Sequence, residues 1–285
     1  MTLTIFTPTY NRAYILPQLY RSLYEQSCKS FVWLIVDDGS TDNTKELVKR
    51  WQKEANFEII YYYQENGGKM RAHNSGVKLC NTDLFMCIDS DDQALPNAVE
   101  EVLCLSKLFT PKTAAAAAAA RLMNKDVKTP WPNNVKHCTM YELGQKYGFH
   151  GETTLVYRTD ILRMYPFPEI EGEKFITEAY VYFQIDKEGY LLLGNKSLVQ
   201  CEYQPDGYSL NEKKLFANNP RGYAMYWNLL LTLPLSLKEK IVAAAKYNAF
   251  CKRAGLQNFI SQCNNPILSL MVLPITQYYY NKLFL

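Results

Sequence analysis

The sequence predicts an α/β fold in which helices cover both faces of a parallel sheet, followed by a mainly helical C-terminal region. Apolar runs of strand length alternate with segments of helical spacing over residues 1–90. Most of these runs are apolar throughout, as expected when both faces of a sheet are covered. After residue 204 the pattern becomes turn-rich and then helical.

The first four strands are expected at 3–6, 31–36, 58–63 and 84–88, where apolar or aromatic runs occur. Three intervening segments place apolar or small residues at helical spacing: Ile15, Leu19 and Leu23; Leu47, Val48 and Trp51; Ala72, Gly76 and Leu79. Strands that alternate with helices pair in parallel through right-handed crossovers.

Composition narrows the class of protein. With 285 residues, 48% of them hydrophobic, the chain can bury a sizeable core. The net charge of +3, without a long basic run, argues against nucleic acid as the main partner. Eight cysteines without a CxxC pair indicate reduced thiols rather than a disulfide framework or zinc site. These features, and the lack of a signal-peptide pattern, favour the cytoplasm.

The turns that follow the four strands are rich in polar residues. They read TPTYNR, DDGSTDN, QENGGKMRAHN and DSDD. In open α/β sheets, ligands bind beyond the carboxyl ends of the strands, so we expect a binding site at this edge.

The DSDD turn carries the clearest chemical signal. In an extended chain Asp89 and Asp91 point to the same side, with Ser90 facing away. Such a pair would repel unless a cation lies between its members, and carboxylate oxygens suit Mg2+ or Mn2+. The alternative is that these aspartates, Asp92 above all, cap the next helix.

Two other turns offer nucleotide contacts. Asp37 and Asp38 can accept hydrogen bonds from a base or ribose, and residues 40–43 are N-cap candidates. Two glycines precede Lys69 and Arg71, whose charges could neutralise a diphosphate. Taken singly, these turns could equally be a capped turn and a solvated loop.

Four motifs together resemble a known family. IFTPTYNR, WLIVDDGSTDNT, ENGGKMRAHNSG and FMCIDSDD resemble, in order and spacing, the nucleotide-sugar domain of family 2 glycosyltransferases over about the first 110 residues. The resemblance implies the GT-A fold, a Rossmann-like mixed sheet flanked by helices. We expect a catalytic domain at 1–204 and a helical acceptor or membrane-proximal region at 205–285.

The resemblance also implies a site. Asp89 and Asp91 would hold Mn2+ or Mg2+ on the donor diphosphate. The expected nucleotide-sugar-binding residues are Pro8, Tyr10, Asn11, Asp37, Asp38, Lys69, Arg71, Asp89 and Ser90.

A catalytic base is expected in the second half of the domain. Family members usually supply it from a Glu-Asp pair that opens a helix, whereas this chain has Glu178 followed by Ala179. Glu178 is therefore the expected base, with Glu171 and Glu173 as competitors. The alternative is that Glu178 only favours a helix N-terminus through its charge.

The implied function is inverting transfer of a sugar from a UDP-sugar to a saccharide or lipid-linked acceptor in cell-surface polysaccharide assembly. A nucleotidyltransferase and a catalytically silent sugar-nucleotide-binding protein are the alternatives. The loop after the first strand, TPTYNR, is not the Gly-rich basic loop expected of a nucleotidyltransferase. The silent protein stays an alternative because Ala179 replaces the aspartate usual in the family.

Three further segments have expected structures. SLKEKIVAAAKYNAFCKRAG predicts an amphipathic helix with a glycine stop. The apolar tail at 266–285 is expected either to lie on a membrane surface, making the protein peripheral to the membrane, or to pack on the protein. The alanine run 114–120 is expected to form a helix or a loop. The histidines His73, His137 and His150 are expected to be structural, with the alternative that His150 lines an acceptor cleft.

Overall fold

The computed structural model describes residues 1–122, 130–132, 134–202, 204 and 212–285. The chain forms two compact units, of which the first comprises Met1–Pro166 and Val181–Gln204, and the second Phe167–Tyr180 and Pro205–Leu285. The sequence-based division at 204 had assigned 167–180 to the N-terminal domain. In the structure the backbone amides of Lys174 and Phe175 donate to Asn219 Oδ1, both at 3.0 Å, so this segment joins the helical unit.

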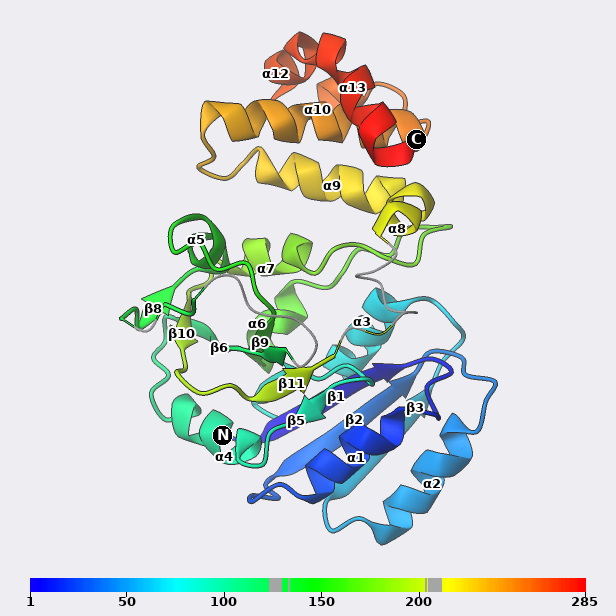
Figure 1. The fold of residues 1–285 in the computed structure, drawn as a ribbon, viewed down its shortest axis with the longest axis vertical. Coiled ribbons are helices and arrows are strands. Elements are labelled where there is room, and N and C mark those ends of the chain that lie inside the picture. Colours follow the sequence, from blue (N-terminus) through cyan, green and yellow to red (C-terminus); the bar gives the residue numbers. More distant parts are fainter. Residues whose placement is uncertain (123–129, 133, 203, 205–211) are drawn as a thin grey trace. The chain divides into compact units, whose positions relative to one another are not determined.

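An eight-stranded mixed sheet organises the first unit (Figure 1). Its order is β3-β2-β1-β4-β9-β6-β10-β8. The strands are β1 Leu3–Thr9, β2 Phe31–Asp37, β3 Glu58–Tyr63, β4 Leu84–Cys87, β6 Thr113–Ala119, β8 His137–Cys138, β9 Thr153–Arg158 and β10 Tyr190–Leu193. The first four are parallel, whereas β9 runs antiparallel to both β4 and β6. The predicted strands and the predicted mixed sheet are thus confirmed.

A small second sheet follows the order β5-β11-β7, with β5 Gln93–Ala94, β11 Val199–Cys201 and β7 Arg121–Leu122. β5 begins directly after the DSDD turn, and Leu95 donates its amide to the carbonyl of Leu198 at 2.8 Å. The chain that leaves the turn is therefore held by β11.

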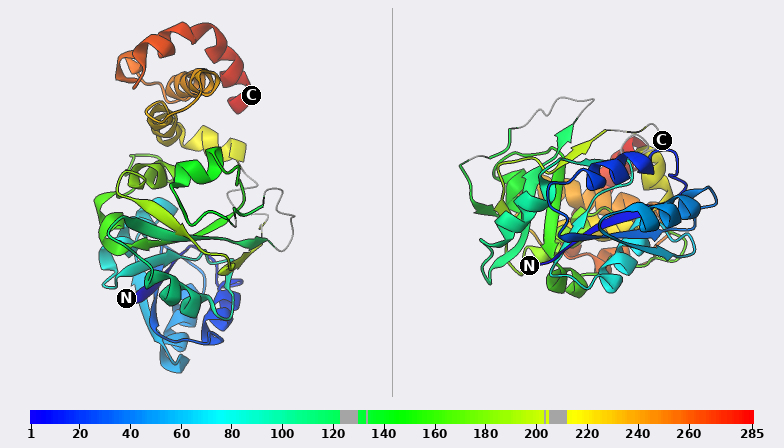
Figure 2. Two further views of the ribbon diagram at one scale, coloured as in Figure 1. Left: turned by 90° about the vertical axis from the view of Figure 1, so that its left-hand side faces the viewer. Right: turned by 90° about the horizontal axis from the view of Figure 1, so that it is seen from below.

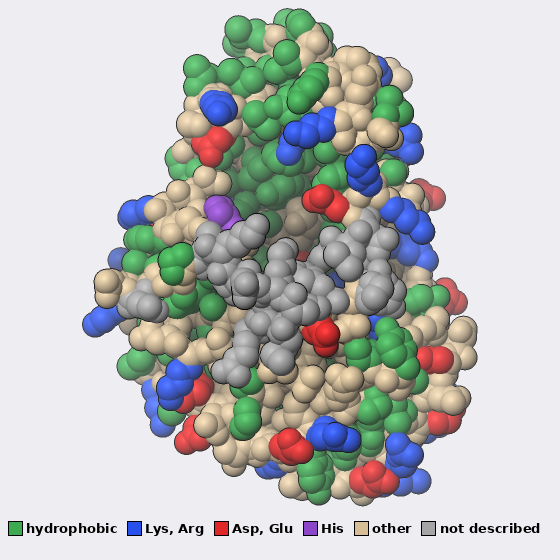
Figure 3. Space-filling model, in the orientation of Figure 1, with side chains coloured by type: hydrophobic (Ala, Val, Ile, Leu, Met, Phe, Trp, Pro, Cys, Tyr) green, Lys and Arg blue, Asp and Glu red, His purple; other side chains and the backbone are tan. Residues whose placement is uncertain are grey.

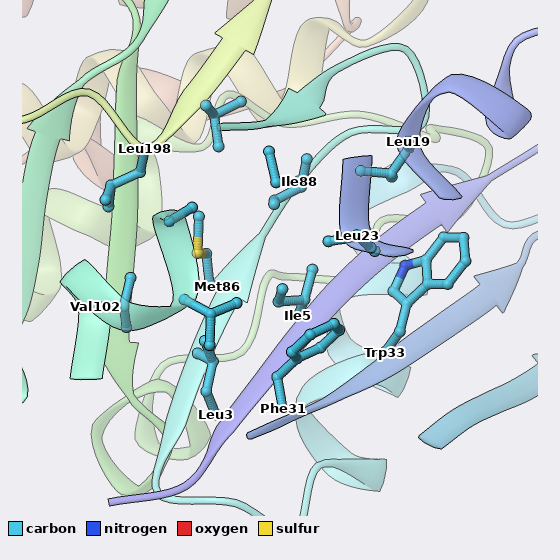
Figure 4. Packing of buried hydrophobic residues seen from close by; sticks show 14 of the residues in the cluster. Leu3, Ile5, Leu19, Leu23, Phe31, Trp33, Met86, Ile88, Val102 and Leu198 are labelled. Carbon is cyan, nitrogen blue, oxygen red and sulfur yellow. The ribbon is translucent and has the colours of Figure 1, made fainter. Parts of the chain in front are cut away.

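Helices α1 Leu16–Tyr24, α2 Thr44–Glu54 and α3 Lys69–Leu79 form where the sequence predicts them. The first unit also contains α4 Ala98–Ser106, α5 Met140–Gln145 and α6 Thr159–Met164, and α7 Ala179–Ile185 crosses the boundary between the units. Leu3, Ile5 and Trp33 pack in one core with residues of α1, α2 and α4 (Figure 4). On the opposite face Phe6 stacks on Phe85 and contacts α3, so helices cover both faces, as predicted.

The alanine run forms β6, neither a helix nor a loop, so that expectation is wrong. β6 pairs antiparallel with β9 and parallel with β10, and its residues are buried. A strand with partners on both sides satisfies its backbone groups through the sheet, and this pairing overrides the helix propensity of alanine.

The second unit is helical, as predicted. Its helices are α8 Glu212–Asn218, α9 Pro220–Leu230, α10 Leu237–Arg253, α11 Phe259–Gln262, α12 Pro266–Met271 and α13 Leu273–Phe284. α10 starts with a capping box between Ser236 and Glu239, and Gly255 follows it with a φ of +66°. α10 packs along α9 and α13 (Figure 2). Within the described residues, no helix is both long and apolar enough to cross a bilayer.

Candidate active site

The acidic segment after β4 is a turn. Asp92 donates its backbone amide to the carbonyl of Asp89 at 3.1 Å, so the expected extended geometry for Asp89 and Asp91 is wrong. The turn still crowds the carboxylates. Burial first, and then the charge of Asp89, raises the pKa of Asp91, and burial with both neighbouring charges raises the pKa of Asp92 to about 8. The turn is therefore a partly buried anionic cluster, in which a further cation would be favourable.

Asp92 does not cap the next helix. α4 begins at Ala98 with Asn97 in the N-cap position, and Asp92 instead lies beside Cys201 of β11, to which it is hydrogen-bonded. The capping alternative for Asp92 is therefore wrong, because β5 separates the turn from the helix.

Lys69 supplies part of the missing positive charge. It is the first residue of α3, and its Nζ lies 2.7 Å from Asp89 Oδ2. Ser90, which separates Asp89 from Asp91 in the sequence, is buried. The turn after β3 and the turn after β4 thus meet at the carboxyl edge of the sheet, as the sequence predicts.

Asp38 organises the glycine turn that leads into α3. Its Oδ1 accepts from Gln64 Nε2 at 2.7 Å and from the Gly67 amide at 2.9 Å. Its Oδ2 accepts from the Gly68 amide at 2.7 Å and from Asn66 Nδ2 at 3.2 Å. Asp38 is only 4% exposed. Its carboxylate therefore builds the loop, and direct contact with a nucleotide stays a prediction.

Asp37 is likewise occupied within the protein. It is fully buried, with Oδ1 accepting from the Ser40 amide at 2.7 Å and Oδ2 from the Tyr61 hydroxyl at 2.6 Å. Burial, followed by this hydrogen bond, raises the pKa of Tyr61. Asp37 thereby joins the turn after β2 to β3, and its predicted contact with the base or ribose is likewise untested.

The turn after β1 is tied to the turn after β2. Asn11 adopts a left-handed φ of +53°, donates its amide to Ser40 Oγ at 2.8 Å and accepts from the Thr41 amide at 2.8 Å. Pro8 lies buried in β1, whereas Tyr10 is half exposed at 49%. Of the three residues of this motif that are expected to bind the nucleotide, Tyr10 is thus the most exposed.

Arg71 lies against the glycine turn. A Cβ placed on Gly67 would come within 2.4 Å of Arg71 Cδ, so a residue with a side chain could fit there only if Arg71 moved. Gly68 has a φ of +94° in the N-cap position of α3. The two glycines therefore allow Arg71 to lie close to the backbone and allow the turn to enter the helix.

The candidate bases differ in their surroundings. Glu178 lies in the second unit, half buried, directly before α7. Both oxygens of Glu173 are occupied at the start of α9, where they accept from the amides of Arg221 at 2.8 Å and Gly222 at 2.9 Å. Glu171 is exposed. Glu173 thus caps a helix, a role that sequence reasoning missed because its partners lie 48 and 49 residues away.

Sequence reasoning also missed Gln64, Asn66 and Tyr61, which hold Asp38 and Asp37. Asn66 immediately precedes the two glycines and Gln64 lies two positions before Asn66, and this position within the motif was the available signal. His73 has the structural role expected of it, since it is buried with its ring edge-on to Phe6 and Phe85.

The donor set suits a hard divalent cation. Among the described residues, no group of three or more His, Cys, Asp and Glu side chains is arranged to hold a metal ion. Two carboxylates suffice for Mg2+ or Mn2+, which keep waters and substrate phosphates as their other ligands. Burial is the first cause of the raised pKa values of Asp91 and Asp92, and the neighbouring carboxylate charges, which such an ion would offset, are the second.

Comparison with known proteins identifies related sequences. Residues 4–166 match the sequence model of the family Glycosyl transferase family 2. Poly-beta-1,6-N-acetyl-D-glucosamine synthase of Staphylococcus aureus is 37% identical over 95 residues, which is 32% of this chain and 22% of that protein. The matches cover between 22% and 36% of the length of the curated relatives.

Solved structures share the fold over nearly the whole chain. S. aureus TarS 1–349 in complex with UDP-GlcNAc has a TM-score of 0.63 at 16% identity, covering 98% of this chain and 82% of that one. GalNAc-T7 with UDP, GalNAc and Mn2+ has a TM-score of 0.62 at 11% identity, covering 98% and 58%. At these identities the likeness concerns the fold alone, and it confirms the predicted GT-A architecture.

Proposed function

The chain belongs to glycosyl transferase family 2, and on this premise we propose that it transfers a sugar from a UDP-sugar to a saccharide or lipid-linked acceptor. The TarS complex contains UDP-GlcNAc, which makes this compound the first donor to test. Assembly of a cell-surface polysaccharide is the proposed setting, and the similarity to a poly-N-acetylglucosamine synthase supports it.

One observation carries the proposal. The acidic turn after β4 and Lys69 of α3 meet at the carboxyl edge of the parallel strands, with Lys69 Nζ 2.7 Å from Asp89 Oδ2. A cation site beside a lysine is suited to a diphosphate, because both offset phosphate charge. Asp37, Asp38 and Asn11 would support this site by fixing the turns around it.

Asp89 and Asp91 would hold Mn2+ or Mg2+, an assignment that the Mn2+ in the GalNAc-T7 structure supports. The bound ion would neutralise charge on the leaving diphosphate. Lys69 would donate to a phosphate oxygen, Ser90 and Arg71 would line the diphosphate side, and Tyr10 and Pro8 would border the base. Asp37 and Asp38 would border the base and ribose while they hold the turns.

Glu178 is the proposed general base for the acceptor hydroxyl. Among its competitors, Glu173 is engaged with two backbone amides of α9, which favours a capping role for that residue. A carboxylate that accepts the acceptor proton makes the hydroxyl oxygen nucleophilic as the sugar leaves the nucleotide. Ala179 replaces the usual aspartate, so Glu178 would act without an acidic neighbour at the next position.

Calorimetric titration of UDP would test the donor site. Binding should require Mn2+, disappear with EDTA, and weaken by at least about tenfold in Asp91→Asn, since charge-assisted contacts are worth about 1.5–3 kcal/mol. Asp160→Asn is the matched control, because Asp160 is an exposed carboxylate paired with Arg158. Equal UDP binding with and without metal would reject the metal-dependent site.

Product analysis with UDP-GlcNAc separates the alternatives. Release of UDP together with a glycosylated acceptor supports the transferase. UDP binding without turnover on any acceptor would indicate a silent sugar-nucleotide-binding protein, and release of pyrophosphate from a nucleoside triphosphate would indicate a nucleotidyltransferase.

A further inference from the structure

Helices α12 and α13 expose an apolar face. Ile267 is 74% exposed, Met271 71%, Tyr278 62% and Leu270 56%. We call these four residues the tail patch. Ile267, Leu270 and Met271 are spaced by three and four positions on α12, as expected for one side of a helix, and Tyr278 belongs to α13, the next helix. Figure 3 shows hydrophobic side chains gathered over this part of the second unit.

The buried side of the same two helices includes polar residues. Ser269 Oγ donates to Asn248 Oδ1 at 2.6 Å, and Asn248 Nδ2 donates to Thr276 Oγ1 at 3.3 Å. All three residues are buried, with Asn248 on α10. These bonds fix the orientation of α12 and α13, because turning them over would leave buried polar groups without partners. Large apolar side chains of α12 therefore face outward, while Val272 and Leu283 are buried.

The helical stretch that carries the tail patch is rich in basic residues, whereas the segment 167–180 of the same unit adds four glutamates and one lysine. Residues 212–285 contain nine Lys and Arg against two acidic residues, Glu212 and Glu239, although the whole chain has a net charge of only +3. Three of these cations adjoin or belong to α13. Lys252 donates to Gln277 at 2.6 Å, Arg253 lies 5.6 Å from the Phe284 ring, and Lys282 is part of the helix.

We propose that the tail patch docks onto the surface of an anionic lipid bilayer, with Ile267, Leu270, Met271 and Tyr278 inserted at the headgroup boundary. Apolar side chains on an outward helical face bind such an interface, and neighbouring Lys and Arg residues are attracted to anionic headgroups. Tyrosine suits this depth because its ring is apolar and its hydroxyl is polar. At a symmetric contact between two copies, the cations that adjoin α13 would meet the same cations of the second copy, whereas a bilayer offers them anionic headgroups.

Vesicle sedimentation tests the proposal on the full chain. The protein should pellet with vesicles of equal parts phosphatidylglycerol and phosphatidylcholine, and much less with phosphatidylcholine alone. Raising the salt concentration should weaken binding, because screening acts on the charge contribution. The variant Ile267→Gln/Met271→Gln should partition at least about tenfold more weakly, because it removes two side chains from the apolar contact.

Leu237→Gln is the matched control. Leu237 is 71% exposed on α10 but lies outside the tail patch, so this variant should bind vesicles like the unmodified chain. Absence of binding to anionic vesicles, or equal loss in the control, would overturn the proposal. Light scattering that shows a dimer dissociated by Ile267→Gln/Met271→Gln would assign the patch to self-association instead. UDP titration of each variant shows whether the nucleotide site is intact, which separates this test from that of the proposed transferase activity.

Discussion

Lys69 Nζ lies 2.7 Å from Asp89 Oδ2, so a cation from the turn after β3 is paired with the acidic turn after β4. The two residues are 20 positions apart in sequence, and the parallel order of β3, β2, β1 and β4 allows their turns to meet at one edge. The lysine offsets only part of the charge of three aspartates. The cluster therefore has capacity for a further cation, and a bound phosphate could draw Lys69 away from Asp89.

Replacing Lys69 should affect ligand binding more than folding. The side chains of Lys69 and Asp89 are 18% and 38% exposed, so we expect Lys69→Met to change the free energy of unfolding by less than about 1 kcal/mol. UDP affinity should fall by about tenfold or more, because a charge-assisted phosphate contact is lost. Urea unfolding and calorimetry measure the two effects. Lys78→Met, an exposed site on the same helix, is the control, and equal affinities for both variants would contradict the assignment.

Removing the charge of Asp38 should destabilise the first unit. The Asp38→Asn side chain keeps one carbonyl oxygen and points an amide group at donors that now face a carboxylate. We expect a loss of about 2–3 kcal/mol in the free energy of unfolding, together with weaker UDP binding. Asp160→Asn should change little. An Asp38→Asn protein of unchanged stability would favour direct nucleotide contact over an anchoring role.

Stability should fall in acid because of His73. Burial, with a smaller effect of Lys69, lowers its pKa from 6.5 to about 3, so the folded protein holds this imidazole neutral. Below pH 6.5 the unfolded chain gains a proton that the folded state lacks, and stability drops as pH falls toward 3. The slope is at most about 1.4 kcal/mol per pH unit.

The variant His73→Leu should remove this slope. The difference in free energy of unfolding between the unmodified chain and the variant, measured by urea unfolding, should change by about 2 kcal/mol between pH 6.5 and pH 5. His137→Leu, at an exposed position of β8, should keep the original slope. A pH dependence that is identical for all three proteins would show that His73 is not the group responsible.

Replacing Glu178 should affect turnover, whereas replacing Glu173 should affect stability. Glu178→Gln should lower kcat by about 10²–10⁴-fold with UDP affinity retained, because a general base is lost while the donor site remains. Glu173→Gln should retain turnover but lose about 1–2 kcal/mol of stability, because it weakens the cap of α9. Steady-state kinetics and thermal unfolding of both variants measure this contrast. Full turnover in Glu178→Gln would exclude it as the base.

The successes of the sequence analysis share one cause. The strands at 58–63 and 84–88 and the helix around Leu19 are marked by local periodicity, and each of these elements forms. The expectation that ligands bind at the carboxyl ends of the strands then correctly predicted that Lys69 and the DSDD turn lie close together, because parallel strands align these ends on one side of a sheet.

The failures depend on distant partners. The backbone turns at Asp89–Asp92, where the sequence suggested an extended chain, and β5 pairs with β11 from more than 100 residues away. The alanine run becomes a strand because β9 and β10 pair with it. Glu173 caps α9 although it lies 48 residues before Arg221, from whose amide it accepts a hydrogen bond.

The sequence by itself determined the order of the first four strands and the three helices between them, the family motifs, and which residue types lie at the ends of those strands, because these follow from local spacing along the chain. Only the tertiary structure decided which carboxylates are occupied by backbone amides, which one is paired with Lys69, and which side of α12 and α13 is buried. Such choices depend on hydrogen bonds and packing between segments far apart in sequence, and local periodicity does not encode them.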